Sequence, residues 1–237
     1  MGGLAEELLS ELECEEVFSF AFPEGIPLIG GFEVVVRESV VITWGIMLAV
    51  VLFCIFLTRN MKVRDIGKRQ LIAETIVTKL EGFVSGMVGE EGKRYVPYLA
   101  TVLVFIGLSN MIGIFGMKPP TKDLNVTVGL SVLSIILIEY AGWHKRGFKG
   151  WLKSFAEPVA VVAPIKVLEL VIRPLSLCMR LFGNVLGAFV IMEMIKIIIP
   201  VAIPVPFSLY FDIFDGLIQA YVFVFLTSLF IKEAIEE

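Results

Sequence analysis

The 237-residue chain is poor in the residues that mark several common classes of protein. It has one histidine and three cysteines, and Cys14, Cys54 and Cys178 lack the spacing of a disulfide framework or a zinc site. No cofactor or metal is therefore expected. Charged residues make up 19%, below the roughly 25% of soluble domains, and the net charge is -4. Without a basic surplus, the composition excludes a typical nucleic-acid binder. The acidic first 22 residues also lack the basic start of a signal peptide.

Long uncharged runs are what the sequence does have, and 57% of its residues are hydrophobic. Residues 39–58 and 95–117 carry no charge, and residues 124–143 carry only Glu139. Each run is close to the roughly 20 residues that a helix needs to cross the hydrocarbon core. The sequence therefore predicts an integral membrane protein with three spans in its first half.

The second half predicts a long helical hairpin, because residues 154–196 and 207–231 are apolar but carry several charges. We place the turn near residues 197–206, which contain three helix-breaking prolines: Pro200, Pro204 and Pro206. A helix over 154–196 would measure about 65 Å, twice the hydrocarbon thickness. It must tilt, run partly along the interface, or break at one of three prolines: Pro158, Pro164 or Pro174.

The fold class is thus an all-α membrane protein with about five spans. Residues 59–94 and 144–153 carry 12 of the 20 basic residues, and the positive-inside rule makes both loops cytoplasmic. The N-terminus is then outside and the C-terminus cytoplasmic. We expect three parts: an external tail (1–38), three spans with their loops (39–153), and the tilted hairpin (154–237).

An amphipathic helix is expected within the first basic loop. Apolar residues recur there at intervals of three and four: Ile72, Ile76, Leu80, Phe83 and Met87. This pattern is typical of a helix that lies at the membrane interface, here the cytoplasmic one.

Charges within the predicted hairpin mark candidate ion-path residues, because an ionisable group at mid-membrane costs about 2.5–3.5 kcal/mol on insertion scales. A helical projection gathers Lys166, Glu169, Arg173 and Arg180 within about 60° on one stripe. On the other arm, three polar residues share a face: Asp212, Asp215 and Gln219. Antiparallel packing would bring Asp212 near Glu193, and Gln219 near Arg180.

Structural interpretations stay open for several of these polar residues. Lys166, Arg173 and Lys196 could extend to the interface, with Glu169 as their partner. Asp215 could contact a helix start, and Arg180 could belong to a buried ion pair. Close helix packing is the preferred interpretation for three residues of the second span: Asn110, Gly113 and Gly116. His144 is interpreted as a solvated loop residue.

Four segments carry a resemblance to a known family. Residues 174–184 (PLSLCMRLFGN) and 216–223 (GLIQAYVF) resemble the two hallmark motifs of the a subunit of bacterial F-type ATP synthase. Residues 119–127 (PPTKDLNVT) and 108–113 (LSNMIG) resemble its external loop and second span. The similarity covers about residues 38–231, in order.

The resemblance implies an ion-translocating stator subunit of the bacterial cell membrane, without a catalytic site of its own. Its partners would be the c-subunit ring, the b subunits, the rest of the ATP synthase and membrane lipids. Two aqueous half-channels would carry H⁺, with Na⁺ left open, to and from the ring. Arg180 would be the essential arginine that faces the ring, and Gln219 its neighbour.

Other positions match the family less closely. Asp212 matches a channel position that usually holds Glu or His, and Asn184 is a candidate lining residue, as is Ser176. Nine residues after the arginine the family commonly has Glu or His, whereas this chain has Phe189. Glu193, one turn later, is the candidate substitute.

Three other functions remain to be weighed. A secondary transporter would suit the membrane charges, but no paired repeat occurs in the sequence. An intramembrane protease would need a catalytic serine or two aspartates from separate helices, whereas Asp212 and Asp215 are neighbours on one. A lipid-bilayer scaffold would not require so many inner charges.

Overall fold

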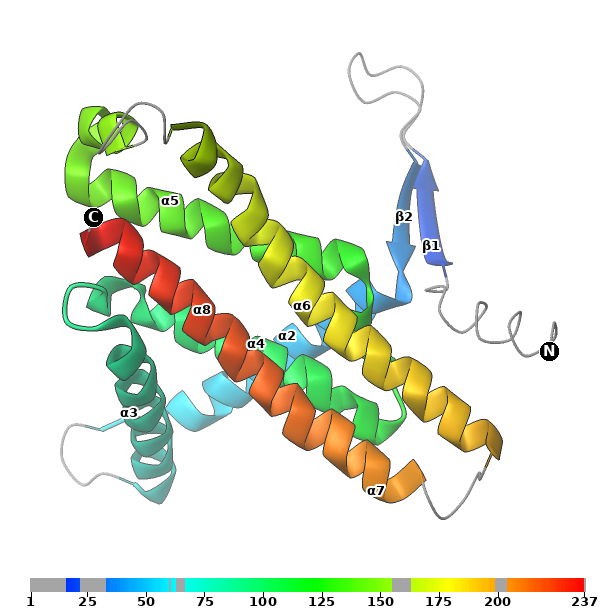
Figure 1. Ribbon diagram of the computed structural model, residues 1–237. Coiled ribbons are helices and arrows are strands. Elements are labelled where there is room, and N and C mark those ends of the chain that lie inside the picture. The colour runs from blue at the N-terminus through cyan, green and yellow to red at the C-terminus, as the bar shows by residue number, and fades with distance from the viewer. Residues whose placement is uncertain are drawn as a thin grey trace.

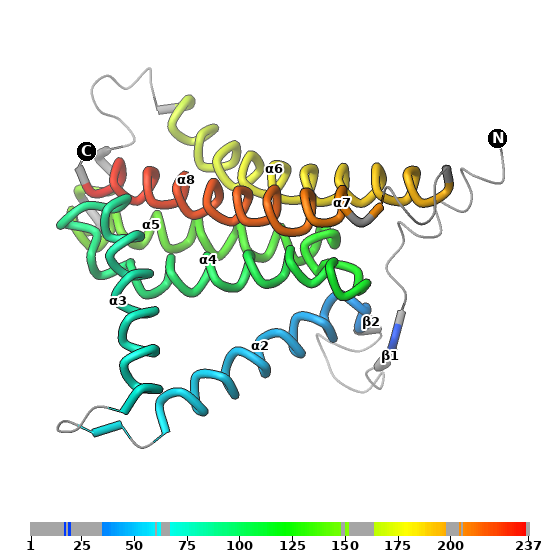
Figure 2. Tube along the Cα trace, turned by 90° about the horizontal axis from the view of Figure 1, so that it is seen from below, coloured from blue at the N-terminus to red at the C-terminus, as the bar shows by residue number. Residues whose placement is uncertain are grey.

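The structure is a computed structural model that describes residues 16–21, 33–59, 61–62, 67–154, 163–198 and 204–236. Five helices are long and apolar enough to cross a membrane: Glu38–Thr58, Lys93–Phe115, Leu124–Gly147, Pro164–Ile197 and Pro206–Ile235. Four of them lie side by side as a bundle, and the first stands at an angle to it (Figures 1 and 2). The prediction of an all-α fold with five spans is confirmed.

The N-terminal part contains a β-hairpin that the sequence analysis did not predict. Strands β1 (Glu16–Ala21) and β2 (Glu33–Arg37) pair antiparallel, and β2 leads directly into α2 (Glu38–Thr58). The hairpin lies at the same end of the molecule as α7, whereas the C-terminus lies at the opposite end (Figure 1). The first and last parts of the described chain therefore mark the two ends of the bundle.

The predicted amphipathic helix is present as α3 (Lys68–Val88). It runs across the axes of the bundle helices, near the end that holds the C-terminus (Figure 2). One side, with Val84 and Val88, is buried against the bundle, while Ile72, Ile76 and Phe83 remain about half exposed. This orientation suits a helix whose exposed apolar side meets the membrane interface.

The second and third spans are joined by a short polar turn. The second span comprises η1 (Lys93–Tyr95), α4 (Val96–Met111) and η2 (Ile112–Phe115), and Gly116 ends it in the left-handed conformation, with φ of 74°. The interpretation of Gly116 as a packing residue is wrong, because a side chain there would meet no atom within 4 Å. Gly116 is needed for its backbone geometry. The turn continues through η3 (Pro120–Lys122).

The third span extends beyond its predicted end. Helix α5 (Leu124–Ser154) continues through the expected basic loop of residues 144–153 and bends at Gly147, whose φ is 71°. The interpretation of His144 as a loop residue is therefore wrong. Its ring lies on this helix, stacked on Tyr140, with Nε2 at 2.7 Å from Nη1 of Arg94.

The hairpin arms are α6 (Ala163–Ile198) and a second arm of three consecutive segments: α7 (Pro204–Ser208), the π-helical η5 (Leu209–Asp215) and α8 (Gly216–Glu236). Helix α6 is about 54 Å long and passes through Pro174 without a break. Pro164 lies in its first turn, where the missing N–H removes no helical hydrogen bond. Pro158 and residues 199–203 of the turn lie outside the described residues.

The core follows the second, third and fifth spans. Helix α8 packs mainly against α4 and α5, and α6 packs mainly against α5. Leu99, Ile106, Ile138 and Phe223 are almost completely buried in this core, whereas α2 and α6 expose many large apolar side chains. An outer surface this apolar is compatible with hydrocarbon rather than with water.

Candidate functional site

A large hollow lies at the hairpin-turn end of the bundle, between η2, α6 and the η5–α8 arm. It has a volume of about 890 Å³. Five of the six predicted site residues line it: Asn184, Glu193, Asp212, Asp215 and Gln219. We call this space the outer cavity. The structure thus brings together side chains from both hairpin arms, as the antiparallel hairpin requires.

Asn110 fixes one wall of the outer cavity. Its side chain is buried, and its Nδ2 donates a hydrogen bond to the carbonyl of Gly216 at 3.0 Å. Its Oδ1 accepts one from Oγ1 of Thr121 at 2.7 Å. A Cβ on Gly216 would lie 2.8 Å from the Cβ of Asn110, so α4 and α8 approach closely only because of this glycine. The packing interpretation of Asn110 is confirmed, with two hydrogen bonds in addition.

Asp212 lies in the π-helical segment η5, a form that often marks functional sites. Oγ of Ser208 donates a hydrogen bond to its Oδ2 at 2.5 Å. Its carboxylate lies against Gly113, where a Cβ would be 2.5 Å from Oδ1. Gly113 is thus confirmed as a packing residue, although its neighbour is a carboxylate rather than a helix backbone.

Asn184 joins the two hairpin arms. Its Nδ2 donates a hydrogen bond to Oδ2 of Asp215 at 2.8 Å and lies 3.5 Å from Oε1 of Gln219. Asp215 therefore contacts the other arm rather than a helix start. The Nε2 of Gln219 is buried and has no hydrogen-bond partner among the described residues, which leaves a donor available beside the cavity.

Glu193 and Phe189 lie on the α6 wall of the outer cavity. Glu193 accepts a hydrogen bond from Nζ of Lys196 at 2.6 Å. Phe189, at the position where the family commonly has a carboxylate or histidine, has the ammonium of buried Lys122 3.6 Å from its ring centroid. This cation–π contact joins the turn after the second span to α6. Lys122 was not among the site residues predicted from the sequence.

Arg180 is the one predicted site residue that does not line the outer cavity. It stands near the midpoint of the Pro164–Ile197 span, and its side chain is exposed on the surface of α6. The hydrogen bonds and ion pairs found among the described residues do not involve it. Arg180 thus has neither the buried acidic partner of the structural interpretation nor a hydrogen bond to Gln219. Ser176, one turn earlier, is exposed as well and is not part of the cavity wall.

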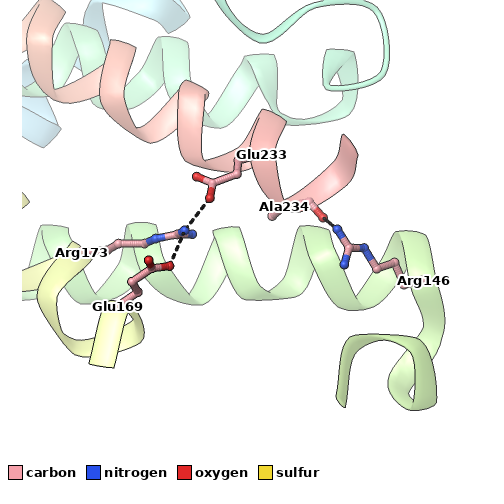
Figure 3. A network of polar contacts seen from close by, with 5 residues as sticks. All are labelled: Arg146, Glu169, Arg173, Glu233 and Ala234. Carbon is pink, nitrogen blue, oxygen red and sulfur yellow. Dashed lines mark hydrogen bonds and ion pairs between the residues drawn. The ribbon is translucent and has the colours of Figure 1, made fainter. Parts of the chain in front are cut away.

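A second polar cluster lies at the other end of the hairpin (Figure 3). Nη2 of Arg173 contacts Glu169 at 3.2 Å on its own helix and Glu233 of α8 at 2.7 Å. The predicted partnership of Glu169 with Arg173 is confirmed, whereas Glu233 was missed because the sequence analysis did not weigh the last charged turn. A small cavity of about 70 Å³ adjoins this cluster and is also lined by Lys166.

The acidic residues of the outer cavity belong to helices that are long and apolar enough to cross a membrane. Across the described ranges, no group of three or more His, Cys, Asp or Glu side chains has the arrangement of a metal centre. Carboxylates and amides lie along a cavity that penetrates between membrane-spanning helices, and intramembrane ionisable groups of this kind mark ion pathways. The fold and the site define an ion-translocating membrane protein.

Comparison with known proteins identifies the family. Residues 40–232 match the family model of the ATP synthase A chain, and the chain belongs to this family. It is 32% identical to ATP synthase subunit a 2 of Bradyrhizobium sp., over 85% of this chain and 90% of the relative. It is 34% identical to ATP synthase subunit a of Moorella thermoacetica, over 83% and 89%. A sodium ion specific subunit a of Propionigenium modestum is 32% identical, over 86% and 75%.

Family membership makes this chain an ion-translocating stator subunit of ATP synthase and a multi-pass membrane protein. It belongs to the ATP synthase complex. This finding decides against the secondary transporter, the intramembrane protease and the lipid-bilayer scaffold.

Proposed function

We propose that the outer cavity is the half-channel that admits ions from outside, and that Arg180 faces the c-subunit ring. The observation that carries this proposal is the placement of the ionisable residues. Glu193, Asp212 and Asp215 line one cavity. Arg180 is exposed on α6, the helix that also carries Glu193, close to the middle of the span. The cavity would bring ions to the ring, and the arginine would act on the ring from the stator side.

The exposed surface of α6 supports a ring partner. Large apolar side chains of α6 on both sides of Arg180 along the helix are about half exposed, among them Leu175, Met179 and Ile191. A guanidinium on such a surface is costly in lipid alone, because arginine stays charged. An apolar helix that carries one carboxylate at the same depth would cover this surface and supply the opposite charge. The ring helices would meet that description.

The ion path then follows from the charges. An ion that enters the outer cavity would pass Glu193, Asp212 and Asp215 and neutralise a ring carboxylate, which can then rotate into lipid. A carboxylate that arrives at Arg180 would be held in its ionised form by the cation and would release its ion to the second, cytoplasmic half-channel. The transmembrane potential contributes about 2.3 kcal/mol per charge per 100 mV. Arg180, as a fixed cation between the channels, would also oppose a direct leak.

The assembly around the chain follows the same proposal. The c ring would contact α6, and the b subunits of the peripheral stalk and membrane lipids would contact other apolar faces. In the bacterial cell membrane the basic residues before and within α3 would be cytoplasmic, with the β-hairpin and the outer cavity outside. The orientation of both termini rests on this charge rule.

Replacement of Arg180 tests the proposed function. In inverted membrane vesicles that contain the whole ATP synthase, we expect Arg180→Ala to abolish ATP-driven ion pumping while the complex remains assembled. Pumping is measured with a pH-sensitive dye for H⁺ and with radioactive Na⁺ for sodium. The control is Leu168→Ala, which truncates an exposed apolar residue of α6 away from the arginine and should leave pumping within about twofold. Normal pumping by Arg180→Ala would exclude the proposed role.

A further inference from the structure

Arg180 lies between two polar contacts that join α6 to α8. On the outer side, Asn184 bonds to Asp215 and approaches Gln219. On the inner side, Nη2 of Arg173 donates a hydrogen bond to Oε1 of Glu233 at 2.7 Å. Along α6, Arg180 is about 10 Å from the inner contact and about 6 Å from the outer one. Both contacts therefore constrain the part of α6 that carries Arg180.

The inner contact lies in the part of the hairpin where α6 begins to separate from α8. In Figure 2 the N-terminal end of α6 turns away from α8, and most of the packing of α6 is against α5. The Arg173 guanidinium crosses this gap and also lies 5.1 Å from the ring centroid of Phe230 on α8. Its side chain is only 19% exposed, so water competes weakly for its hydrogen bonds.

Helix α5 holds the same turn of α8 from another side. Nη2 of Arg146 donates a hydrogen bond to the carbonyl of Ala234 at 3.3 Å (Figure 3). Glu233, which Arg173 contacts, is therefore adjacent to Ala234, which Arg146 of α5 holds independently. Glu233 is a fixed point for α6, rather than the free end of a helix.

Helix geometry connects this contact to the arginine of the ion path. Arg173 and Arg180 are seven residues apart, so they project within about 20° of each other on α6. Side chains extend about 5–6 Å from a helix axis, so a rotation of about 20° would move the Arg180 guanidinium by about 2 Å. Displacements of about 1 Å can cost about a hundredfold in rate where charged groups must meet in a defined geometry.

We propose that the Arg173–Glu233 ion pair is a positioning clamp, which sets the rotation of α6 and thereby the position at which Arg180 meets the ring. Glu233 also neutralises the charge of Arg173. A ring carboxylate would then respond to Arg180 and not to a second cation two turns away. The inference rests on the proposed role of Arg180.

The test uses the complete ATP synthase in inverted vesicles and measures the ratio of the initial rate of ATP-driven ion pumping to the amount of assembled complex. Arg173→Gln and Glu233→Gln should each lower this ratio by at least about fivefold, as expected for the loss of about 1 kcal/mol of positioning energy. The exchanged pair, Arg173→Glu with Glu233→Arg, should restore the ratio to within about twofold. Glu169→Gln is the matched control, because it removes a contact of Arg173 within α6 and leaves the link to α8 intact.

Two results would overturn the clamp: parental ratios in both single variants, or an exchanged pair as poorly coupled as the single variants. If Arg173→Gln is not recovered as an assembled complex, Glu233→Asp replaces it. This variant shortens the contact and should lower the ratio by about threefold, and a parental ratio would equally reject the clamp. Arg180→Ala in the same membranes separates the two proposals. Normal pumping by Arg180→Ala would reject the proposed function. If Arg180→Ala loses pumping while the Arg173 and Glu233 variants pump like the parent, only the clamp is rejected.

Discussion

The contact between Gly113 and the Asp212 carboxylate yields a sharp prediction about the outer cavity. In Gly113→Ala the new Cβ would lie 2.5 Å from Oδ1 and 2.8 Å from Cγ of Asp212, closer than such atoms can approach. The carboxylate must rotate away or η2 must separate from η5. Rotation would disturb the 2.5 Å hydrogen bond from Ser208 that holds Asp212 in place.

The expected magnitude follows from the cost of overpacking, about 1–3 kcal/mol. If that cost falls on the conformation in which Asp212 accepts ions, its population drops by about 5- to 150-fold. We therefore expect Gly113→Ala to lower ATP-driven pumping at least about fivefold, without loss of the assembled complex, because the strain is local.

Gly107→Ala provides the matched control on the same span. Its new Cβ would meet only Cδ2 of Leu217, at 3.7 Å, which is an ordinary contact. Alanine also favours the helix over glycine by about 1 kcal/mol. Pumping and complex yield are measured for both variants in the same vesicle assay. Equal pumping by Gly113→Ala and Gly107→Ala would refute the idea that Asp212 must occupy its present position.

Two further predictions concern the cavity wall and the core. Glu193→Gln and Asp212→Asn should each slow ion uptake, and the double variant should be slower than either, because both carboxylates line the outer cavity. Initial rates in vesicles decide this, and an unaltered double variant would reject the channel assignment. Cys178 is buried, with its Sγ 3.5 Å from Oγ1 of Thr127, and does not line the outer cavity. Cys178→Ala should keep most of the pumping activity and cost about 1 kcal/mol of stability, seen as a lower melting temperature of the purified complex.

The spans were predictable because their lengths are set by the bilayer and their ends by charge. Helix α2 begins at Glu38 and ends at Thr58, one residue before Arg59, as the uncharged run implies. The basic residues after Trp143 did not mark the end of the helix, because α5 continues through them. A helix that emerges from the membrane can remain helical in water. Pro174 did not break α6. Proline is tolerated inside membrane helices, because neighbouring helices and local adjustments can satisfy the freed carbonyl.

The residues that line the outer cavity could also be predicted from the sequence, whereas the contacts between them could not. Spacings of three and four placed Asp212, Asp215 and Gln219 on one face, and the hairpin brought Asn184 and Glu193 opposite them. The π-helical segment could not be read from its own residues. It forms where Asp212 packs on Gly113 and where the next residue after the segment, Gly216, packs on Asn110. These contacts join segments about a hundred residues apart, which periodicity within one helix does not encode.

Phe189 shows how the chain accommodates its departure from the family pattern. A carboxylate at this position would face the buried ammonium of Lys122 and form an ion pair with it. The ring instead provides Lys122 with a neutral partner at 3.6 Å and presents no charge to the cavity. The acid lies one helical turn further on, as Glu193, where Lys196 contacts it nearer the hairpin turn. Lys122 in the turn after the second span thus contacts Phe189 on α6, and Glu193 lines the same cavity as this phenylalanine.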